Sequence, residues 1–339
     1  MRAAVFAGDG RVEVVDRPRP AAELHDDIVI KIQANGLCGS DLRAFATPPE
    51  MRYDVGVIVG HEFSGVVAEA GPGATLAVGG RVTVHPNIWC QRCYYCRTNR
   101  INLCDNFVHI GSMRDGGAAE YCVVPERMVY RLPDSLPVDR AALAEPLACV
   151  LNGTAQAAVA PGESVLVLGG GPIGLLYLML FKAAGAFPVI VSEPTAERAR
   201  WARELGADEV IDYRSADWPE RVRDLTEGRG VDHVVETIGE LAPSVRALGM
   251  EGEIAFVGLL ARDDGLPAID PQALWTKGLT LRAIAVGSRA QFEAMNRAIE
   301  TNRITPVIDR VFAFGEAIDA YRYYERARPL GKVVIAHGE

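Results

Sequence analysis

Four cysteines of the sequence lie close enough together to hold one metal ion. They are Cys90, Cys93, Cys96 and Cys104, in the pattern Cys-x2-Cys-x2-Cys-x7-Cys. Four thiolates at such short spacing can form a tetrahedral shell around one Zn²⁺, and a closed shell leaves no position for water, so this metal would be structural. Clustered cysteines also hold iron–sulfur clusters or remain free thiols, and the spacing alone leaves these alternatives open.

A second pair of turns carries donors of a different kind. Cys38 lies in a glycine-flanked turn over 36–41, and His61 and Glu62 lie in another over 60–65. A single buried histidine or cysteine usually packs in a core without binding a metal. Together with a nucleotide site, however, cysteine and histidine ligands with one open position are typical of a catalytic zinc.

A glycine-rich loop has the composition and the setting of such a nucleotide site. Its residues are Gly169, Gly170, Gly171, Pro172, Ile173 and Gly174. The loop follows the apolar run 164–168 and precedes a helix predicted over 172–184. In that context Gly169 permits a tight turn, Gly171 lets the backbone approach a pyrophosphate, and Gly174 lets helix and strand pack closely. The helix N-terminus would offer its free N–H groups to the phosphates. A glycine turn that serves packing alone is the alternative.

An acidic residue follows the next predicted strand. Glu193 comes directly after the run 188–192, where a carboxylate can accept hydrogen bonds from both ribose hydroxyls of a dinucleotide. The same carboxylate would repel a 2′-phosphate, so the sequence favours NAD over NADP. Arg198 could cover the adenine or, in another rotamer, attract a phosphate.

The predicted secondary structure around these groups changes near residue 150. Residues 1–150 contain short apolar or alternating runs separated by Gly, Pro and Asp, which predicts a β-rich barrel or sandwich. From residue 164 apolar strands alternate with helices. Buried parallel strands read as continuous apolar runs, so this part predicts a doubly wound α/β fold.

Composition and charge exclude several classes of function. The chain has 339 residues, of which 49% are hydrophobic and 23% charged, as expected for a globular protein of about two domains. The net charge of −9 argues against a basic nucleic-acid-binding surface. No apolar run reaches the roughly 18 residues of a membrane helix, and the first ten residues lack a signal-peptide pattern. We therefore expect a cytoplasmic protein that binds neither nucleic acid nor membrane.

The sequence resembles the zinc-dependent medium-chain alcohol dehydrogenase family over essentially its whole length. The resemblance rests on the pattern Gly60-His61-Glu62-x2-Gly65-x5-Gly71, with the cysteine loop and the glycine loop in the family's order. Cys-Gly-Ser-Asp at 38–41 and Ala-Glu-Pro-Leu at 144–147 are similar to the polyol (sorbitol-type) and threonine dehydrogenase branch. The resemblance implies a GroES-like β-barrel catalytic domain over 1–150, completed by about 286–339, and an NAD-binding Rossmann domain over 151–285.

The resemblance also implies roles for individual residues, with two zinc ions per chain. The structural ion would lie in the four-cysteine loop, which the resemblance favours over the other readings. The catalytic ion would be bound by Cys38 and His61, with Glu62 and Glu145 as ligands directly or through water. Ser40 would pass the substrate proton outward.

Cofactor contacts are implied by the same alignment. They would come from Gly169, Gly171, Pro172, Ile173, Gly174, Glu193 and Arg198, and, flanking the nicotinamide, from Val257, Gly258, Leu259, Ile284 and Ala285.

These features predict an oxidoreductase that transfers a hydride between NAD and a secondary alcohol of a polyol, sugar or cyclitol. A threonine 3-dehydrogenase-type amino-alcohol enzyme is one alternative, and a catalytically inactive cofactor-binding regulator is another. Where relatives often carry a relay histidine, this sequence has Arg43, which either binds a polar or anionic substrate group or lies on the surface. The substrate pocket is expected to include Phe45, Tyr53, Ile110 and Leu260, and the resemblance implies a homotetramer or homodimer.

Overall fold

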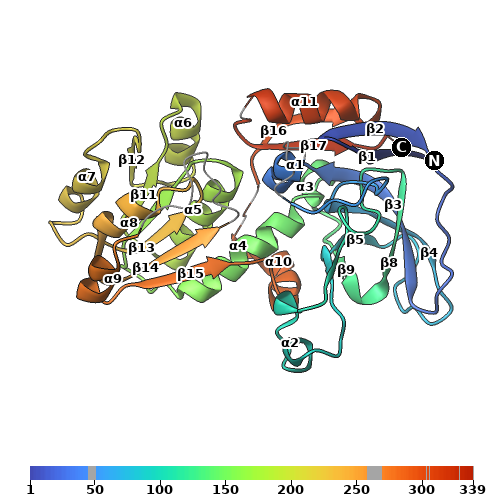
Figure 1. Cartoon of the computed structure of the whole chain (residues 1–339), viewed down its shortest axis with the longest axis horizontal. Coiled ribbons are helices and arrows are strands. Elements are labelled where there is room, and N and C mark those ends of the chain that lie inside the picture. Colours follow the sequence, from blue (N-terminus) through green and yellow to red (C-terminus); the bar gives the residue numbers. More distant parts are fainter. Residues whose placement is uncertain (45–50, 258–268, 303, 305, 328, 339) are drawn as a thin grey trace. The chain divides into compact units, whose positions relative to one another are not determined.

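The computed structural model describes residues 1–44, 51–257, 269–302, 304, 306–327 and 329–338. The chain divides into two compact units (Figure 1). The first unit comprises Met1–Ala148, Ser288–Asn296 and Pro306–Glu339, and the second comprises Cys149–Gly287 and Arg297–Thr305. Within the described residues, no helix is both long and apolar enough to span a bilayer.

A largely antiparallel sheet forms the centre of the first unit. Its strands run in the order β16–β17–β3–β4–β5–β9, and β8 also pairs with β3. Their bounds are β3 Asp27–Gly36, β4 Glu62–Ala70, β5 Arg81–Val84, β8 Tyr121–Pro125, β9 Val129–Arg131, β16 Ile308–Ala313 and β17 Lys332–Ala336. Alternate residues such as Ile28, Ile30 and Ile32 on β3 share one apolar core, because side chains on a strand alternate between its two faces.

Shorter elements surround this sheet. They are β1 Arg2–Gly8, β2 Arg11–Asp16, α1 Gly39–Ala44, β6 Asn87–Ile88, α2 Tyr94–Arg97, η1 Ile101–Leu103, β7 Val108–His109, η2 Glu126–Met128, α3 Val138–Ala141, η3 Phe314–Glu316 and α11 Ala317–Ala327. The helix α11 lies along β16 and β17 (Figure 1), where Ala320 and Tyr321 pack with Val333 and Ile335. The loop that carries α2 extends away from the sheet and is closed at its base by pairing of β6 with β7.

The second unit is built on a parallel sheet. Its strand order is β12–β11–β10–β13–β14–β15, the doubly wound order of a Rossmann fold. The strands are β10 Val165–Leu168, β11 Val189–Ser192, β12 Glu209–Ile211, β13 Val231–Glu236, β14 Leu248–Val257 and β15 Thr280–Ile284. All four residues of β10 are buried, which explains its uninterrupted apolar sequence. The doubly wound parallel sheet predicted for this part of the chain is confirmed.

The helices of the second unit follow the strands in alternation. They are α5 Pro172–Ala184, α6 Ala196–Glu204, α7 Trp218–Asp224, α8 Leu241–Ala247 and α9 Pro271–Lys277, while α4 Ala144–Ala157 and α10 Arg289–Asn302 contribute residues to both units. Local chemistry sets the ends of α5. Pro172 occupies its first turn, and Gly185 ends it with a left-handed φ of 87° that favours glycine.

Candidate metal centres and cofactor loop

The four cysteine sulfurs of the loop around α2 converge on one point. The ligand atoms of Cys90, Cys93, Cys96 and Cys104 all lie within 4.8 Å of one another. Two of the sulfur pairs, Cys90–Cys96 and Cys93–Cys104, are 4.0 Å apart. A tetrahedral zinc with Zn–S bonds of about 2.3 Å places its sulfurs about 3.8 Å apart. The donor set therefore fits a single zinc ion, whereas the irons and sulfides of a cluster would hold cysteines further apart.

Backbone N–H groups donate hydrogen bonds to sulfurs of this group. Cys90 donates its N–H to Cys104 Sγ at 3.3 Å, and Cys93 donates to Cys90 Sγ at 3.4 Å. Hydrogen bonds from the backbone of Arg92 and Cys93 lower the pKa of Cys90 to about 6. Because the thiolate is the form that binds metal, these hydrogen bonds favour the binding form of Cys90. Burial instead raises the pKa of Cys96 to about 12.

The register of two strands builds the other donor set. β3 and β4 pair antiparallel with Gly36 opposite Glu62. Cys38, two residues beyond the end of β3, therefore lies beside His61, the residue directly before β4. The ligand atoms of Cys38, His61 and Glu62 lie within 4.8 Å of one another. A Cβ on Gly36 would lie 2.7 Å from Glu62 Oε2, so only glycine leaves room for this carboxylate.

The surroundings of His61 are anionic and dry. His61 is 5% exposed, and its Nδ1 is buried without a hydrogen-bond partner, 3.7 Å from Asp41 Oδ1. Burial lowers the pKa of this imidazole, but the negative groups of Cys38, Asp41 and Glu145 raise it to about 10. Surroundings that attract a proton so strongly attract a divalent cation for the same electrostatic reason. The donor set thus fits a zinc ion.

Asp41 anchors this site, although its sequence motif alone predicted no role for it. It is fully buried on α1, accepts the Cys38 N–H at 3.0 Å through Oδ2, and accepts the Tyr53 hydroxyl at 2.8 Å through Oδ1. It therefore fixes the backbone of Cys38 while facing the ring of His61. Its only signal in the sequence is its position three residues after Cys38.

Lys332 is the second residue that the sequence did not reveal. Its ammonium donates to Glu62 Oε1 at 2.6 Å and to the carbonyl oxygen of Leu37 at 2.8 Å. Burial alone would lower the pKa of Lys332, but Glu62 and Cys38 raise it above its usual value. The two charges are 270 residues apart in the chain, so no local pattern could have paired them.

His109 adds a second imidazole next to the donors. Its ring centroid is 5.0 Å from that of His61, and its Nδ1 is 2.9 Å from Ser112 Oγ. Burial, with His61 and His85 nearby, lowers the pKa of His109 to about 3. The neutral ring can therefore offer a hydrogen bond beside the metal position.

The remaining residues predicted for this centre lie on two helices. Glu145 is buried in the first turn of α4 and lies outside the group formed by Cys38, His61 and Glu62. Ser40 and Arg43 lie on α1 and are partly exposed. Of the expected pocket residues, Tyr53 and Ile110 are buried in the first unit, whereas Phe45 and Leu260 lie outside the described residues.

The glycines of the loop in the second unit have two different roles. A Cβ on Gly169, whose φ is 98°, would lie 2.5 Å from Thr237 Oγ1, and a Cβ on Gly174 would lie 1.9 Å from the carbonyl oxygen of Gly169. A Cβ on Gly171 would meet nothing within 4 Å. Gly169 and Gly174 thus permit close packing, while Gly171 faces open space at the N-terminus of α5. That geometry fits the approach of a pyrophosphate.

Glu193 is drawn into this loop. Its Oε2 accepts the N–H of Gly170 at 2.9 Å, and its Oε1 accepts the N–H of Thr195 at 2.8 Å. Arg198 Nη1 lies 3.6 Å from the same carboxylate. Glu193 and Arg198, the two residues predicted to contact the adenosine, therefore lie together at the edge of the loop.

The residues predicted to flank the nicotinamide lie at the ends of two neighbouring strands. Val257 ends β14 and Ile284 ends β15, and these two residues pair in register. The carbonyl oxygen of Ala285 accepts a hydrogen bond of 3.1 Å from Nδ2 of Asn152. Gly258 and Leu259 lie outside the described residues.

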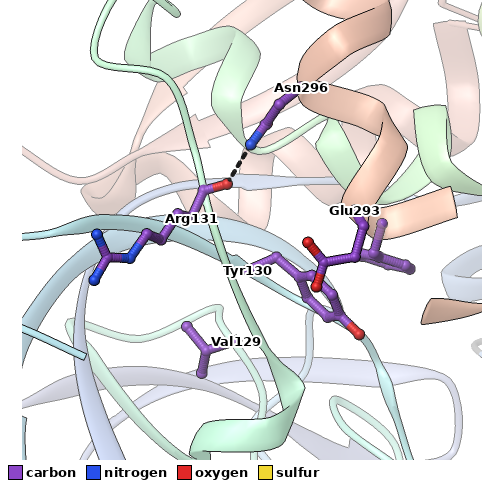
Figure 2. A pocket seen from close by; sticks show the side chains of 6 residues that line it. Val129, Tyr130, Arg131, Glu293 and Asn296 are labelled. Carbon is purple, nitrogen blue, oxygen red and sulfur yellow. Dashed lines mark hydrogen bonds between the residues drawn. The ribbon is translucent and has the colours of Figure 1, made fainter. Parts of the chain in front are cut away.

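A separate hollow of about 240 Å³ lies between β9 and α10 (Figure 2). It is lined by Val129, Tyr130, Arg131, Phe292, Glu293 and Asn296. Asn296 donates to the carbonyl oxygen of Arg131 at 2.8 Å across its edge. None of the residues predicted for metal or cofactor binding lines it, so it is not the candidate active site.

Comparisons with known proteins agree with this chemistry. The family model described as alcohol dehydrogenase GroES-like domain matches residues 25–134, and the model described as zinc-binding dehydrogenase matches residues 172–301. The L-threonine 3-dehydrogenase of Pyrococcus abyssi (strain GE5 / Orsay) is 39% identical over 334 residues, covering 95% of this chain and 93% of that protein. The sorbitol dehydrogenase of Bacillus subtilis (strain 168) is 34% identical over 271 residues, covering 78% and 76%.

A solved structure is similar over nearly the whole chain. The crystal structure of galactitol-1-phosphate dehydrogenase from Escherichia coli is 28% identical with a TM-score of 0.91, and the match covers 99% of this chain and 100% of that one.

Proposed function

The chain belongs to the zinc-binding alcohol dehydrogenase family, and on this premise we propose that it oxidises a secondary alcohol of a polyol, sugar or cyclitol with NAD. The observation that carries the proposal is the convergence of half-buried Cys38 with buried His61 and Glu62 in a chain that also holds a dinucleotide loop. Relatives named sorbitol and galactitol-1-phosphate dehydrogenase support a polyhydroxylated substrate.

In this proposal the two units divide the work. The catalytic domain is formed by residues 1–150 and completed by about 286–339, and residues 151–285 bind NAD. Each chain holds two zinc ions, one structural in the four-cysteine loop and one catalytic. We further propose that the protein is cytoplasmic and assembles as a homotetramer or homodimer, as the family resemblance implies.

The residues of the catalytic centre would act as follows. Cys38 and His61 hold the ion, and Glu62 and Glu145 contribute directly or through water. When bound, zinc supplies a Lewis acid that lowers the pKa of an alcohol, and the nicotinamide supplies the hydride acceptor. Ser40 takes up the hydroxyl proton at Oγ and passes it toward solvent. Asp41 keeps Cys38 and His61 in place throughout.

The cofactor residues would bind and orient NAD. The first-turn N–H groups of α5 bind the pyrophosphate, and the bare backbone at Gly171 lets it approach. Glu193 accepts the ribose hydroxyls and disfavours a 2′-phosphate, which supports NAD over NADP. Arg198 covers the adenosine, and the chain ends after β14 and β15 flank the nicotinamide.

A threonine 3-dehydrogenase-type reaction is the second candidate. It is favoured by the 39% identity to the Pyrococcus abyssi enzyme over 95% of this chain. Both reactions require the same zinc and cofactor residues, so the substrate distinguishes them. A regulator without turnover is the third reading, but it gives no reason for the buried donors to converge.

One experiment tests these readings together. The purified protein is analysed for metal content, and reduction of NAD and NADP is measured with polyols, polyol phosphates, cyclitols, L-threonine and other amino alcohols. We expect two zinc ions per chain and turnover of polyols with NAD. Cys38→Ala should lose one zinc and all turnover while it keeps the other ion. A Cys38→Ala variant that retains both ions and full activity would contradict the proposed site.

A further inference from the structure

A buried ion pair lies directly against the catalytic donors. Lys332 is 3% exposed and Glu62 is 1% exposed. Both carboxylate oxygens of Glu62 lie against the ammonium group, and Oε1 accepts a hydrogen bond of 2.6 Å. Because neither charge is in contact with solvent, removal of one partner leaves the other without compensation.

The sheet explains why this lysine reaches both sides of the site. β17 pairs with β3 with Val334 opposite Gly36, and Gly36 in turn lies opposite Glu62 on β4. Lys332, at the start of β17, therefore crosses the end of β3. Its ammonium binds the carbonyl oxygen of Leu37, the residue before Cys38, as well as Glu62 itself.

The same carboxylate is therefore available to two cations. Glu62 belongs to the set of three donors around the metal position, and it is also the counter-ion of Lys332. A carboxylate that shares its charge with an ammonium is a weaker metal ligand than a free one. When Glu62 leaves the metal, moreover, Lys332 keeps it paired in a site where an unpaired charge would be costly.

We propose that Lys332 is a positioning residue that draws Glu62 from the metal and so keeps a coordination position open for the substrate hydroxyl. This inference rests on the proposed function, since it requires a metal at Cys38 and His61. Lys332 itself touches neither substrate nor cofactor in this account, and it acts through the carboxylate of Glu62.

The test replaces the catalytic zinc by Co²⁺, whose visible absorption bands weaken as its coordination number rises. In Lys332→Met, Glu62 should remain on the metal, so these bands should weaken. Release of catalytic zinc to a chelator should slow about tenfold, the lower end of the effect of outer-shell partners on metal sites. The maximal rate should fall because the open position is filled.

Two further variants separate positioning from a structural role. In a Glu62→Gln background, Lys332→Met should cause no further change in the cobalt bands or in zinc release, because the carboxylate through which Lys332 acts is already absent. Lys332→Gln, whose amide still donates to the Leu37 carbonyl oxygen, removes the charge with less disturbance of the fold. It should shift both readouts in the same direction as Lys332→Met.

Lys182→Met is the matched control. Lys182 is paired with Asp208 at 2.8 Å, but its side chain is 30% exposed in the second unit, so its loss should alter neither readout. Unchanged bands and release rates in both Lys332 variants would overturn the inference. So would equal effects of Lys332→Met in the wild-type protein and in the Glu62→Gln background. A wild-type protein that binds only the four-cysteine zinc would instead refute the proposed function, and metal content shows this first.

Discussion

The stability of the first unit should fall on mild acidification because of one histidine whose ring nitrogens are buried. His337 follows β17, and both of its ring nitrogens are buried without a hydrogen-bond partner among the described residues. Its ring stacks on Phe314 with centroids 4.5 Å apart. Burial, and secondarily the charge of Arg2, lowers the pKa of His337 to about 4. The folded protein therefore keeps this ring neutral where an unfolded chain protonates it.

The sign and the size of the effect follow from linkage. An unfolded histidine titrates near pH 6.5, so between about pH 6.5 and pH 4 the unfolded state binds more protons than the folded state. The free energy of unfolding should therefore fall as the pH drops through this window. The difference of about 2.5 pH units corresponds to a loss of about 3 kcal/mol at pH 4 relative to pH 7.

Two measurements check this prediction. Proton NMR of the ring should report the low pKa of His337 directly in the folded protein. Urea unfolding of wild type, His337→Phe and His337→Asn at pH 7, 5 and 4 should show that wild type loses about 3 kcal/mol more than either variant. Metal ligands also protonate in this range, but they do so in all three proteins, so the difference isolates His337. Equal pH dependence in the three proteins would show that His337 does not destabilise the folded protein in acid.

Four further outcomes follow from the candidate sites. Gly174→Ala should lower the melting temperature and weaken NAD binding at least tenfold, since overpacking against the Gly169 carbonyl oxygen, 1.9 Å away, costs about 1–3 kcal/mol. Gly171→Ala, which meets no atom, should weaken NAD binding in a titration without changing that temperature. Cys93→Ser should reduce the zinc content from two ions to one and destabilise the loop around α2 in limited proteolysis, with the Cys38 metal retained; loss of both ions would count against independent sites. Asp41→Asn should weaken binding of the catalytic metal by about tenfold to hundredfold in a competition assay, because the negative charge facing His61 is lost while the amide oxygen can still accept the Cys38 N–H; unchanged affinity would show that the Asp41 charge does not support the metal.

The glycine loop and the cysteine loop could be predicted because each is contiguous in the chain. Cys90 to Cys104 form one loop, and Gly169 to Gly174 join one strand to one helix. Short-range spacing constrains such groups before any tertiary contact forms. The helix after the glycine loop was predicted for the same reason, and the bounds of α5 agree with the predicted range 172–184.

The catalytic donors needed more than spacing. Nothing local joins Cys38 to His61, and the resemblance to a family, not the pattern, paired them in the sequence. In the structure, the pairing of Gly36 with Glu62 brings the two together. The register of an antiparallel pair is a tertiary property, because a shift by one residue would turn the same side chains to the other face.

Patterns along the chain were therefore enough to identify the chemical groups of the protein and the order of its two kinds of domain. Folding was needed to place Asp41 against His61, His109 beside that ring, and Lys332 against Glu62. These contacts could not be predicted because burial and charge pairing depend on distances in space. Lys332 and Glu62 interact strongly because strand pairing removes both from water, and no pattern of residues along the chain encodes that removal.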